Sequence, residues 1–265
     1  MYEEFFRMSK TPFTRGIPSD CLYSDDDILE VQNRLIYTAQ KQLFAVLSAD
    51  AGMGKTTLLR CLYEKLNGTE YTVLYLSDSK LTPRHFYNGL LEQLGCETSF
   101  YRGDARKLLH HQIEIMRGVG HKKLVVIVDE AHLLSKEMFE EIRFLLNYHM
   151  DSENPLALIL SGQSEMSDKL KLQSLRAVQH RIDVKCFLEP YDFSKTKAYI
   201  TRQLLFSGHE GDIFSEEAMR VIHQFSGGIP RLINRACSQS LCYAYQSRRN
   251  IVDDHMVQEV LRGEV

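Results

Sequence analysis

A short glycine-containing loop combines the residue types that hold phosphate groups. The stretch "SADAGMGKTT", residues 48–57, contains two glycines followed by a lysine and two threonines. In such a loop successive backbone N–H groups point at an anion, the lysine reaches the outer phosphates, and a hydroxyl holds Mg²⁺. We therefore predict that a nucleotide's phosphates are bound by Ala51, Gly52, Met53, Gly54, Lys55, Thr56 and Thr57.

The loop departs at one position from the G-x-x-x-x-G-K-[ST] pattern, because Ala49 stands where the first glycine is usual. Ala49 lies at the exit of an apolar run, before most of the cradling amides. Its methyl group matters only if that position needs a positive φ or very close packing. We therefore predict that the loop is intact.

An acidic pair follows a second apolar run downstream. In "VVIVDE", residues 125–130, four apolar residues lead to Asp129 and Glu130. Asp129 is predicted to hold Mg²⁺ through water together with Thr56, and Glu130 to polarise an attacking water. The presence of both Lys55 and Glu130 argues against a decayed site. The sequence therefore predicts nucleotide binding and hydrolysis.

Short apolar runs alternate with helical patterns and supply the framework for these residues. The predicted strands are residues 43–48, 71–77, 123–132, 155–162 and 182–190. The predicted helices between and before them are residues 25–42, 56–66, 82–95, 104–120 and 135–149. This alternation predicts an α/β fold: a parallel five-stranded sheet with a phosphate loop, flanked by helices on both faces.

Pro190 marks a change in pattern. Beyond it the strand signals stop, and helical patterns follow over residues 192–208, 215–227, 229–248 and 252–263. The sequence therefore predicts two domains, an α/β nucleotide-binding domain over residues 1–190 and an all-helical lid domain over residues 191–265.

Composition limits the possible partners. The net charge is −3, so nucleic-acid binding would require a local basic patch. The six cysteines match no zinc or redox spacing, and we predict that they are small buried side chains in a reducing compartment. No apolar run approaches the ~18 residues of a membrane span, and the acidic start "MYEEFF" does not resemble a signal peptide. These features predict a cytoplasmic protein without a membrane partner.

Several motifs together carry a family resemblance. They are "GMGKTT", "DEAH", "SGQSEM", "QHRI", "GGIPRLINRAC" and the aromatic opening "YEEFFRMSKTPF". Over nearly its whole length the chain resembles AAA+ ATPases of the ExeA/GspA-like group, whose wider relatives include the MuB and TnsC regulators of DNA transposition and, more distantly, origin-recognition ATPases. The resemblance implies ATP and Mg²⁺ as cofactors.

The resemblance also implies roles for residues outside the phosphate loop. Ser161 or Gln163 would be sensor 1, which positions the water near the γ-phosphate. Arg231 would be sensor 2, unless it is a solvated surface arginine. Arg181 would be the arginine finger offered to a neighbouring subunit, with Arg176 as a competing candidate and a surface salt bridge as the alternative. A finger implies a homo-oligomer, and head-to-tail contacts give a ring or a helical filament.

The favoured function is a DNA-associated ATPase that assembles on duplex DNA and regulates transposition by target selection and transposase activation. Secretion-type members continue into a membrane span and a cell-wall-binding region, which this sequence does not show before Val265. Related transposition ATPases imply DNA contacts around the second strand and its following helices, where a solvated helix face is the alternative. The matching basic residues are Lys80, Arg84, Arg102, Arg106 and Lys107.

Two other functions stay open. A secretion-type ATPase of the ExeA/GspA kind would remodel proteins with a membrane partner and would bind no nucleic acid. A nucleotide-gated switch in phage defence or signalling is the third. DNA stimulation of ATP hydrolysis would distinguish the first function from the other two.

Overall fold

The computed structural model describes residues 2–66, 68, 70–78, 81–118, 120–147 and 154–262. The chain divides into two compact units. The α/β unit comprises Asp27–Ala51 and Lys55–Leu188, and the helical unit comprises Met1–Asp26, Gly52–Gly54 and Glu189–Val265. Within the described ranges, no helix has both the length and the apolar character needed to cross a membrane.

The α/β unit is built on one parallel sheet. Its strands are β1 (Phe44–Ser48), β2 (Tyr71–Leu76), β3 (Lys123–Val128), β4 (Ala157–Gly162) and β5 (Val184–Phe187). Their order is β2-β3-β4-β1-β5, and every neighbouring pair is parallel. The predicted five-stranded parallel sheet is therefore confirmed. β3 is shorter than the predicted strand because Glu130 has a left-handed backbone, with φ 51°, which ends the extended conformation.

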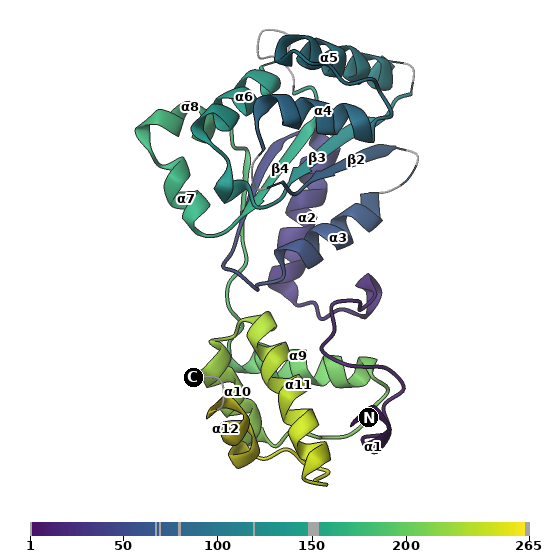
Figure 1. Ribbon diagram of the computed structural model, residues 1–265, viewed down its shortest axis with the longest axis vertical. Helices are drawn as coiled ribbons and strands as arrows, with labels where there is room; N and C mark the ends of the chain where they lie inside the picture. The colour runs from purple at the N-terminus through teal and green to yellow at the C-terminus, as the bar shows by residue number, and fades with distance from the viewer. Residues whose placement is uncertain are drawn as a thin grey trace. The chain divides into compact units, whose positions relative to one another are not determined.

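Helices cover both faces of this sheet (Figure 1). They are α2 (Asp26–Lys41), α3 (Lys55–Leu66), α4 (Pro83–Gln93), α5 (Arg102–Gly118) and α6 (Lys136–Leu146). Side chains alternate between the two faces of a strand, so β1, β3 and β4 contribute to two separate cores. One core packs against α4, α5 and α6, and the other against α2 and α3.

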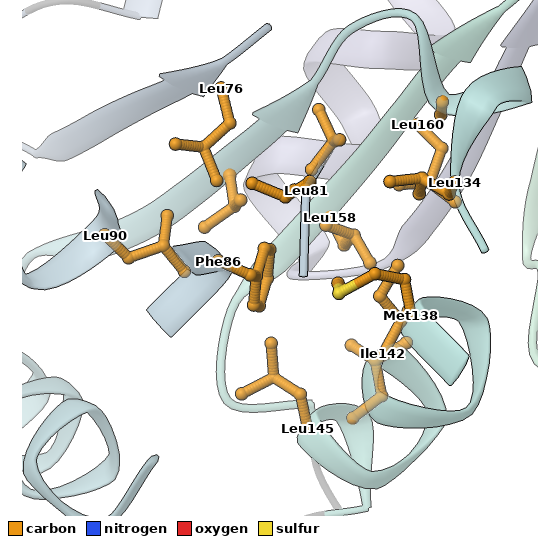
Figure 2. Packing of buried hydrophobic residues seen from close by; sticks show 14 of the residues in the cluster. Leu76, Leu81, Phe86, Leu90, Leu134, Met138, Ile142, Leu145, Leu158 and Leu160 are labelled. Carbon is orange, nitrogen blue, oxygen red and sulfur yellow. The ribbon is translucent and has the colours of Figure 1, made fainter. Parts of the chain in front are cut away.

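Figure 2 shows the first of these cores. Leu76, Leu158 and Leu160 from the sheet face Phe86 of α4 and Ile142 of α6. Phe86 and Ile142 are fully buried, so α4 and α6 pack against the same face of the sheet. Burial of each such aliphatic or aromatic side chain stabilises the folded unit by about 1.5–3 kcal/mol.

In the described part of the α/β unit, the sequence does not predict four short helices. They are η2 (Ala131–Leu133), α7 (Glu165–Leu170), η4 (Gln173–Leu175) and α8 (Arg176–Gln179). None is longer than six residues, which is too short for a 3.6-residue period to show in the sequence. Three of them fill the connection between β4 and β5.

The helical unit combines the C-terminal helices with the start of the chain. Its elements are α1 (Tyr2–Phe5), η1 (Ser19–Cys21), α9 (Phe193–Phe206), α10 (Glu216–Ser226), α11 (Pro230–Gln246) and α12 (Asp254–Arg262). The sequence predicts the first 26 residues as part of the α/β domain, whereas the structure groups Met1–Asp26 with the helical unit. The cause is aromatic packing: Phe6 and Phe13 are buried in the core of the C-terminal helices, where Phe13 meets the ring of Phe214 edge-on at 6.4 Å.

The six cysteines are free thiols in different environments. Cys61, Cys186 and Cys237 are buried, and Cys21 and Cys96 are partly buried. Cys242 is exposed, so the prediction that all six are buried is wrong for Cys242 and holds only in part for Cys21 and Cys96.

Candidate active site

The phosphate loop joins β1 to α3, and its two glycines are required by the backbone. Gly52 and Gly54 both have φ +89°, a conformation that L side chains rarely adopt. At Gly54 an added Cβ would meet nothing within 4 Å, so only the backbone angle demands glycine there. At Gly52 an added Cβ would lie 2.9 Å from the Cβ of Arg231. Within the helical unit, the Arg231 backbone N–H also donates to the Gly52 carbonyl at 3.2 Å.

Ala49 does not share this requirement. It is not among the residues with positive φ, and its side chain is 3% exposed. Its backbone N–H donates to the Gly162 carbonyl at the end of β4 at 3.2 Å, so the position continues the pairing of β1 with β4. An alanine therefore meets the conformational need of this position.

Lys55 begins α3 and directs its ammonium group back into the loop. The side chain is 8% exposed, and Nζ donates to the carbonyls of Ala49 at 2.7 Å and Asp50 at 3.1 Å. Hydrogen bonds between charged partners are roughly twice as strong as neutral ones. A bound phosphate would therefore compete well with these carbonyls for the ammonium group. This arrangement suits the predicted role of Lys55.

The Asp129 carboxylate, which follows β3, is the centre of the site. It is 4% exposed and accepts four hydrogen bonds. Oδ2 accepts from the hydroxyls of Thr56 at 3.1 Å and Tyr75 at 2.9 Å. Oδ1 accepts from the Ser161 hydroxyl at 2.8 Å and the Glu130 backbone N–H at 2.9 Å. These donors compensate for the burial of the negative charge.

The donor set fits Mg²⁺. Thr56 and Asp129, the two predicted ligands, place a hydroxyl and a carboxylate oxygen 3.1 Å apart. In the described part of the chain, no group of three or more His, Cys, Asp or Glu side chains could hold a metal ion. Mg²⁺ suits such a site because it typically uses one or two carboxylates and completes its shell with phosphates and water.

Glu130 has a strained backbone and an accessible side chain. Its φ of 51° and ψ of 32° are left-handed, and such a conformation typically costs about 1–3 kcal/mol in a non-glycine residue. The hydrogen bond from its N–H to Asp129 helps to hold this turn. Its carboxylate is 46% exposed and lies 3.5 Å from His132 Nδ1. The side chain can therefore contact a water molecule, as a general base must.

The two sensor 1 candidates occupy different positions. Ser161 is fully buried at the end of β4 and donates directly to Asp129. Gln163 follows the strand, and its backbone N–H contacts His132 Nδ1 at 3.5 Å. Only Ser161 is thus part of the hydrogen-bond shell of the carboxylate. Two further contacts escaped the sequence analysis: Ser164 hydrogen-bonds to Asp50 of the loop, and Ser167 donates to Ser48 at 3.1 Å.

The arginine finger candidates lie on the connection between β4 and β5. Arg176 begins α8, is exposed, and donates from Nε to Nε2 of His180 at 3.3 Å. Arg181 is partly buried in the turn before β5. A role across a subunit interface stays a prediction for both residues. The same holds for Arg231, which is exposed at the start of α11.

Two of the predicted DNA-contacting arginines have a buried partner. Arg102 and Arg106 of α5 lie 3.4 Å and 3.8 Å from the carboxylate of Glu141 on α6. Glu141 is 4% exposed and also accepts a 2.7 Å hydrogen bond from the Tyr87 hydroxyl. Burial, followed by this hydrogen bond, raises the pKa of Tyr87 well above its usual range. Arg102 and Arg106 thus neutralise a buried carboxylate, a partner that the sequence did not reveal.

The other predicted DNA contacts differ among themselves. Arg84 is exposed on α4, and its guanidinium lies 4.4 Å from the centre of the Phe100 ring. Lys107 is exposed on α5. Lys80 lies outside the described residues.

Tyr75 is a further member of the site that the sequence does not predict. Burial, together with the hydrogen bond to Asp129, raises its pKa well above the usual value, so the phenol stays a neutral donor. The sequence shows an aromatic hydroxyl near the carboxyl end of a strand. Its partner follows only from the order of the strands, which places β2 beside β3.

Comparison with known proteins agrees with this geometry. Residues 38–170 match the family model described as AAA domain. General secretion pathway protein A of Aeromonas hydrophila is 32% identical over 249 residues, which cover 92% of this chain and 45% of that protein. The chain therefore spans less than half the length of this relative.

Solved structures share the fold at low sequence identity. Cdc6p from Pyrobaculum aerophilum gives a TM-score of 0.69 at 16% identity, covering 91% of this chain and 67% of that chain. The Drosophila ORC bound to DNA gives 0.68 at 19% identity, covering 98% of this chain and 64% of that chain. The relation to the MuB and TnsC regulators stays a prediction. The family model matches half of the chain, and the phosphate loop lies beside Asp129. The chain therefore belongs to the AAA family, as a P-loop ATPase of the AAA+ type.

Proposed function

We propose that the protein binds ATP with Mg²⁺ and hydrolyses it between subunits. We further propose that its ATP-bound form assembles as a ring or filament on duplex DNA, where it regulates transposition by selecting a target and activating a transposase. The observation that carries the catalytic part is the Thr56–Asp129 contact, 3.1 Å long, with the exposed Glu130 carboxylate next in the chain. This contact supports the proposal because it gathers the proposed metal ligands and the proposed base at one end of the sheet.

Each residue of this site has a separate task in the proposed reaction. Lys55 releases the loop carbonyls and donates to the phosphates instead. Thr56 and Asp129 would hold Mg²⁺, which supplies charge neutralisation at the phosphates when it is bound. Glu130 accepts a proton from the attacking water, and its 46% exposed carboxylate suits this task. Arg181 or Arg176 of a neighbouring subunit would stabilise the charge of the transition state.

Support for the DNA part comes from the family resemblance and from exposed cations on two neighbouring helices. Arg84 on α4 and Lys107 on α5 are both exposed, and α4 and α5 pack together. The net charge of the chain is −3, so binding to DNA phosphates would depend on such local cations and would weaken as salt rises. One solved structure with this fold is the Drosophila ORC bound to DNA.

The test is ATP hydrolysis with and without duplex DNA, together with negative-stain images in a slowly hydrolysed ATP analogue. We expect DNA-stimulated turnover and rings or filaments on DNA. Lys55→Ala should lose nucleotide binding, whereas the exposed Lys41→Ala should keep it. Glu130→Gln should bind ATP but stall and retain its assemblies. Absence of salt-sensitive DNA binding by the ATP-loaded protein would contradict the DNA part of the proposal.

A second candidate is a secretion-type ATPase that remodels proteins and binds no nucleic acid. The 32% identity to General secretion pathway protein A favours it. It predicts ATP hydrolysis that is indifferent to DNA, with no assembly on DNA. Stimulation of turnover by a protein partner, in the absence of DNA, would select this candidate.

A further inference from the structure

We propose that Tyr75 is a positioning residue that orients the Asp129 carboxylate for its divalent cation. The inference rests on the proposed function, because it takes Asp129 as a ligand of Mg²⁺. Tyr75 lies on the neighbouring strand and is absent from the phosphate loop and from the acidic motif.

The hydrogen bonds around Asp129 carry the argument. A carboxylate offers about four lone-pair sites, and here four donors use them. A metal-bound Thr56 hydroxyl would no longer occupy its site on Oδ2. Tyr75 would then be the side chain that donates to this oxygen, at 2.9 Å, while Ser161 and the Glu130 N–H hold Oδ1. The phenol thus leaves a lone pair of Oδ2 free for the metal shell and fixes the plane of the carboxylate.

The fold holds Tyr75 in place from two sides. On one side β2 pairs with β3, with Tyr75 opposite Ile127, and the Asp129 N–H donates to the Leu76 carbonyl at 2.8 Å. On the outer side, the Gln93 amide accepts from the Tyr75 N–H and donates to the Tyr75 carbonyl, both at 3.0 Å. β2 is the edge strand of the sheet, so Gln93 of α4 takes the place of a further strand at this residue. The phenol is therefore directed at Asp129 before any ligand arrives.

Removal of the hydroxyl should loosen the carboxylate without disturbing the fold. Tyr75→Phe keeps the ring and the Gln93 pairing, since both backbone groups remain. Hydrogen-bond partners that orient metal ligands typically account for a 10–100-fold difference in metal affinity or activity. Because Ser161 and the Glu130 N–H still hold Oδ1, we expect the lower limit, about tenfold weaker divalent-cation affinity.

The experiment measures Mn²⁺ binding by electron paramagnetic resonance in the presence of a non-hydrolysed ATP analogue, with Mg²⁺-dependent ATP hydrolysis as a second readout. Tyr71→Phe is the matched control, because it also removes a phenolic hydroxyl from β2, at a residue four positions before Tyr75. We expect Tyr75→Phe to bind Mn²⁺ about tenfold more weakly than Tyr71→Phe. Its ATP hydrolysis should recover at high Mg²⁺. The melting temperature of the ligand-free protein should fall by only about 2–5 °C, because three donors to Asp129 remain there.

Gln93→Ala provides a second, independent variant. It should weaken Mn²⁺ binding in the same direction, and it should add little when Tyr75→Phe is already present. If the wild type binds Mn²⁺ with nucleotide but Tyr75→Phe and Tyr71→Phe bind it equally well, the role of Tyr75 is overturned and the proposed metal site stands. A wild type that binds no Mn²⁺ with nucleotide would overturn both the inference and the proposed metal site.

Discussion

The buried carboxylate of Glu141 should be essential for stability, although it lies away from the phosphate loop. Glu141→Ala removes the acceptor of the Tyr87 hydroxyl, which is fully buried and 2.7 Å away. It also removes a carboxylate partner of both Arg102 and Arg106. The variant thus leaves one buried donor without its acceptor and breaks two ion pairs, although Arg102 keeps Glu137 at 3.9 Å.

The size of the effect follows from these contacts. A buried donor that loses its acceptor costs about 1–3 kcal/mol. The two arginine side chains are 55% and 42% exposed, so each ion pair contributes only about 0.2–1 kcal/mol. The expected loss of unfolding free energy is therefore about 1.5–5 kcal/mol. For a unit of this size it corresponds to a melting temperature lower by about 3–20 °C.

The assay is thermal and urea unfolding followed by circular dichroism, with Glu140→Ala as the control. Glu140 is the neighbouring residue, and its carboxylate is 48% exposed and lies 3.9 Å from Lys136, so its loss should cost less than about 0.5 kcal/mol. Tyr87→Phe completes a double-mutant cycle, in which we expect a coupling of about 1.5–3 kcal/mol with Glu141→Ala. The reasoning is refuted if Glu141→Ala is as stable as Glu140→Ala, or if the cycle is additive.

Three further predictions concern assembly, DNA and pH. Arg181→Ala should lose hydrolysis but keep nucleotide affinity, and mixing it with Lys55→Ala should restore turnover; a mixture that stays inactive at every ratio argues against a finger in trans. Lys107→Ala should weaken DNA binding and reduce its salt slope by about 1 with unchanged melting temperature, which titrations at several salt concentrations would measure. Burial, followed by the nearby Arg106, lowers the pKa of His110. Below about pH 6.5, His110 binds a proton in the unfolded chain but less readily in the folded protein, so the free energy of unfolding decreases as the pH is lowered. In His110→Gln, the melting temperature should decrease less steeply as the pH is lowered; the same pH dependence as in the wild type would exclude the effect.

The sequence predicts the parts of the site that are contiguous in the chain. Lys55 and Thr56 are close in sequence to the glycines that shape their loop, and Asp129 follows an apolar run that forms a buried strand whatever the order of strands in the sheet. The neighbouring residues in the sequence are therefore sufficient to predict these members of the site. The same reasoning places all five strands, with errors confined to their ends: β3 ends at Val128, four residues before the predicted end, because the chain turns at the left-handed Glu130.

Residues that depend on which elements become neighbours were not predictable in this way. Tyr75 meets Asp129 because β2 lies beside β3, and the chain order of strands does not state their order in the sheet. Glu141 meets Arg102 and Arg106 because α5 and α6 cover the same face. From the sequence alone, these arginines could only be interpreted as a solvated or DNA-facing helix surface.

The four hydrogen bonds to Asp129 also explain why a nucleotide should be needed for metal binding. Without ligand, the buried carboxylate is already stabilised by donors from α3, β2, β4 and its own turn. A cation that binds there must first displace the Thr56 hydroxyl, so it replaces one favourable contact by another. The net gain from the protein ligands is therefore small, and phosphate oxygens must supply most of the remaining coordination. We therefore expect metal and nucleotide binding to be coupled, because the lone pairs of the Asp129 carboxylate are used in the ligand-free state.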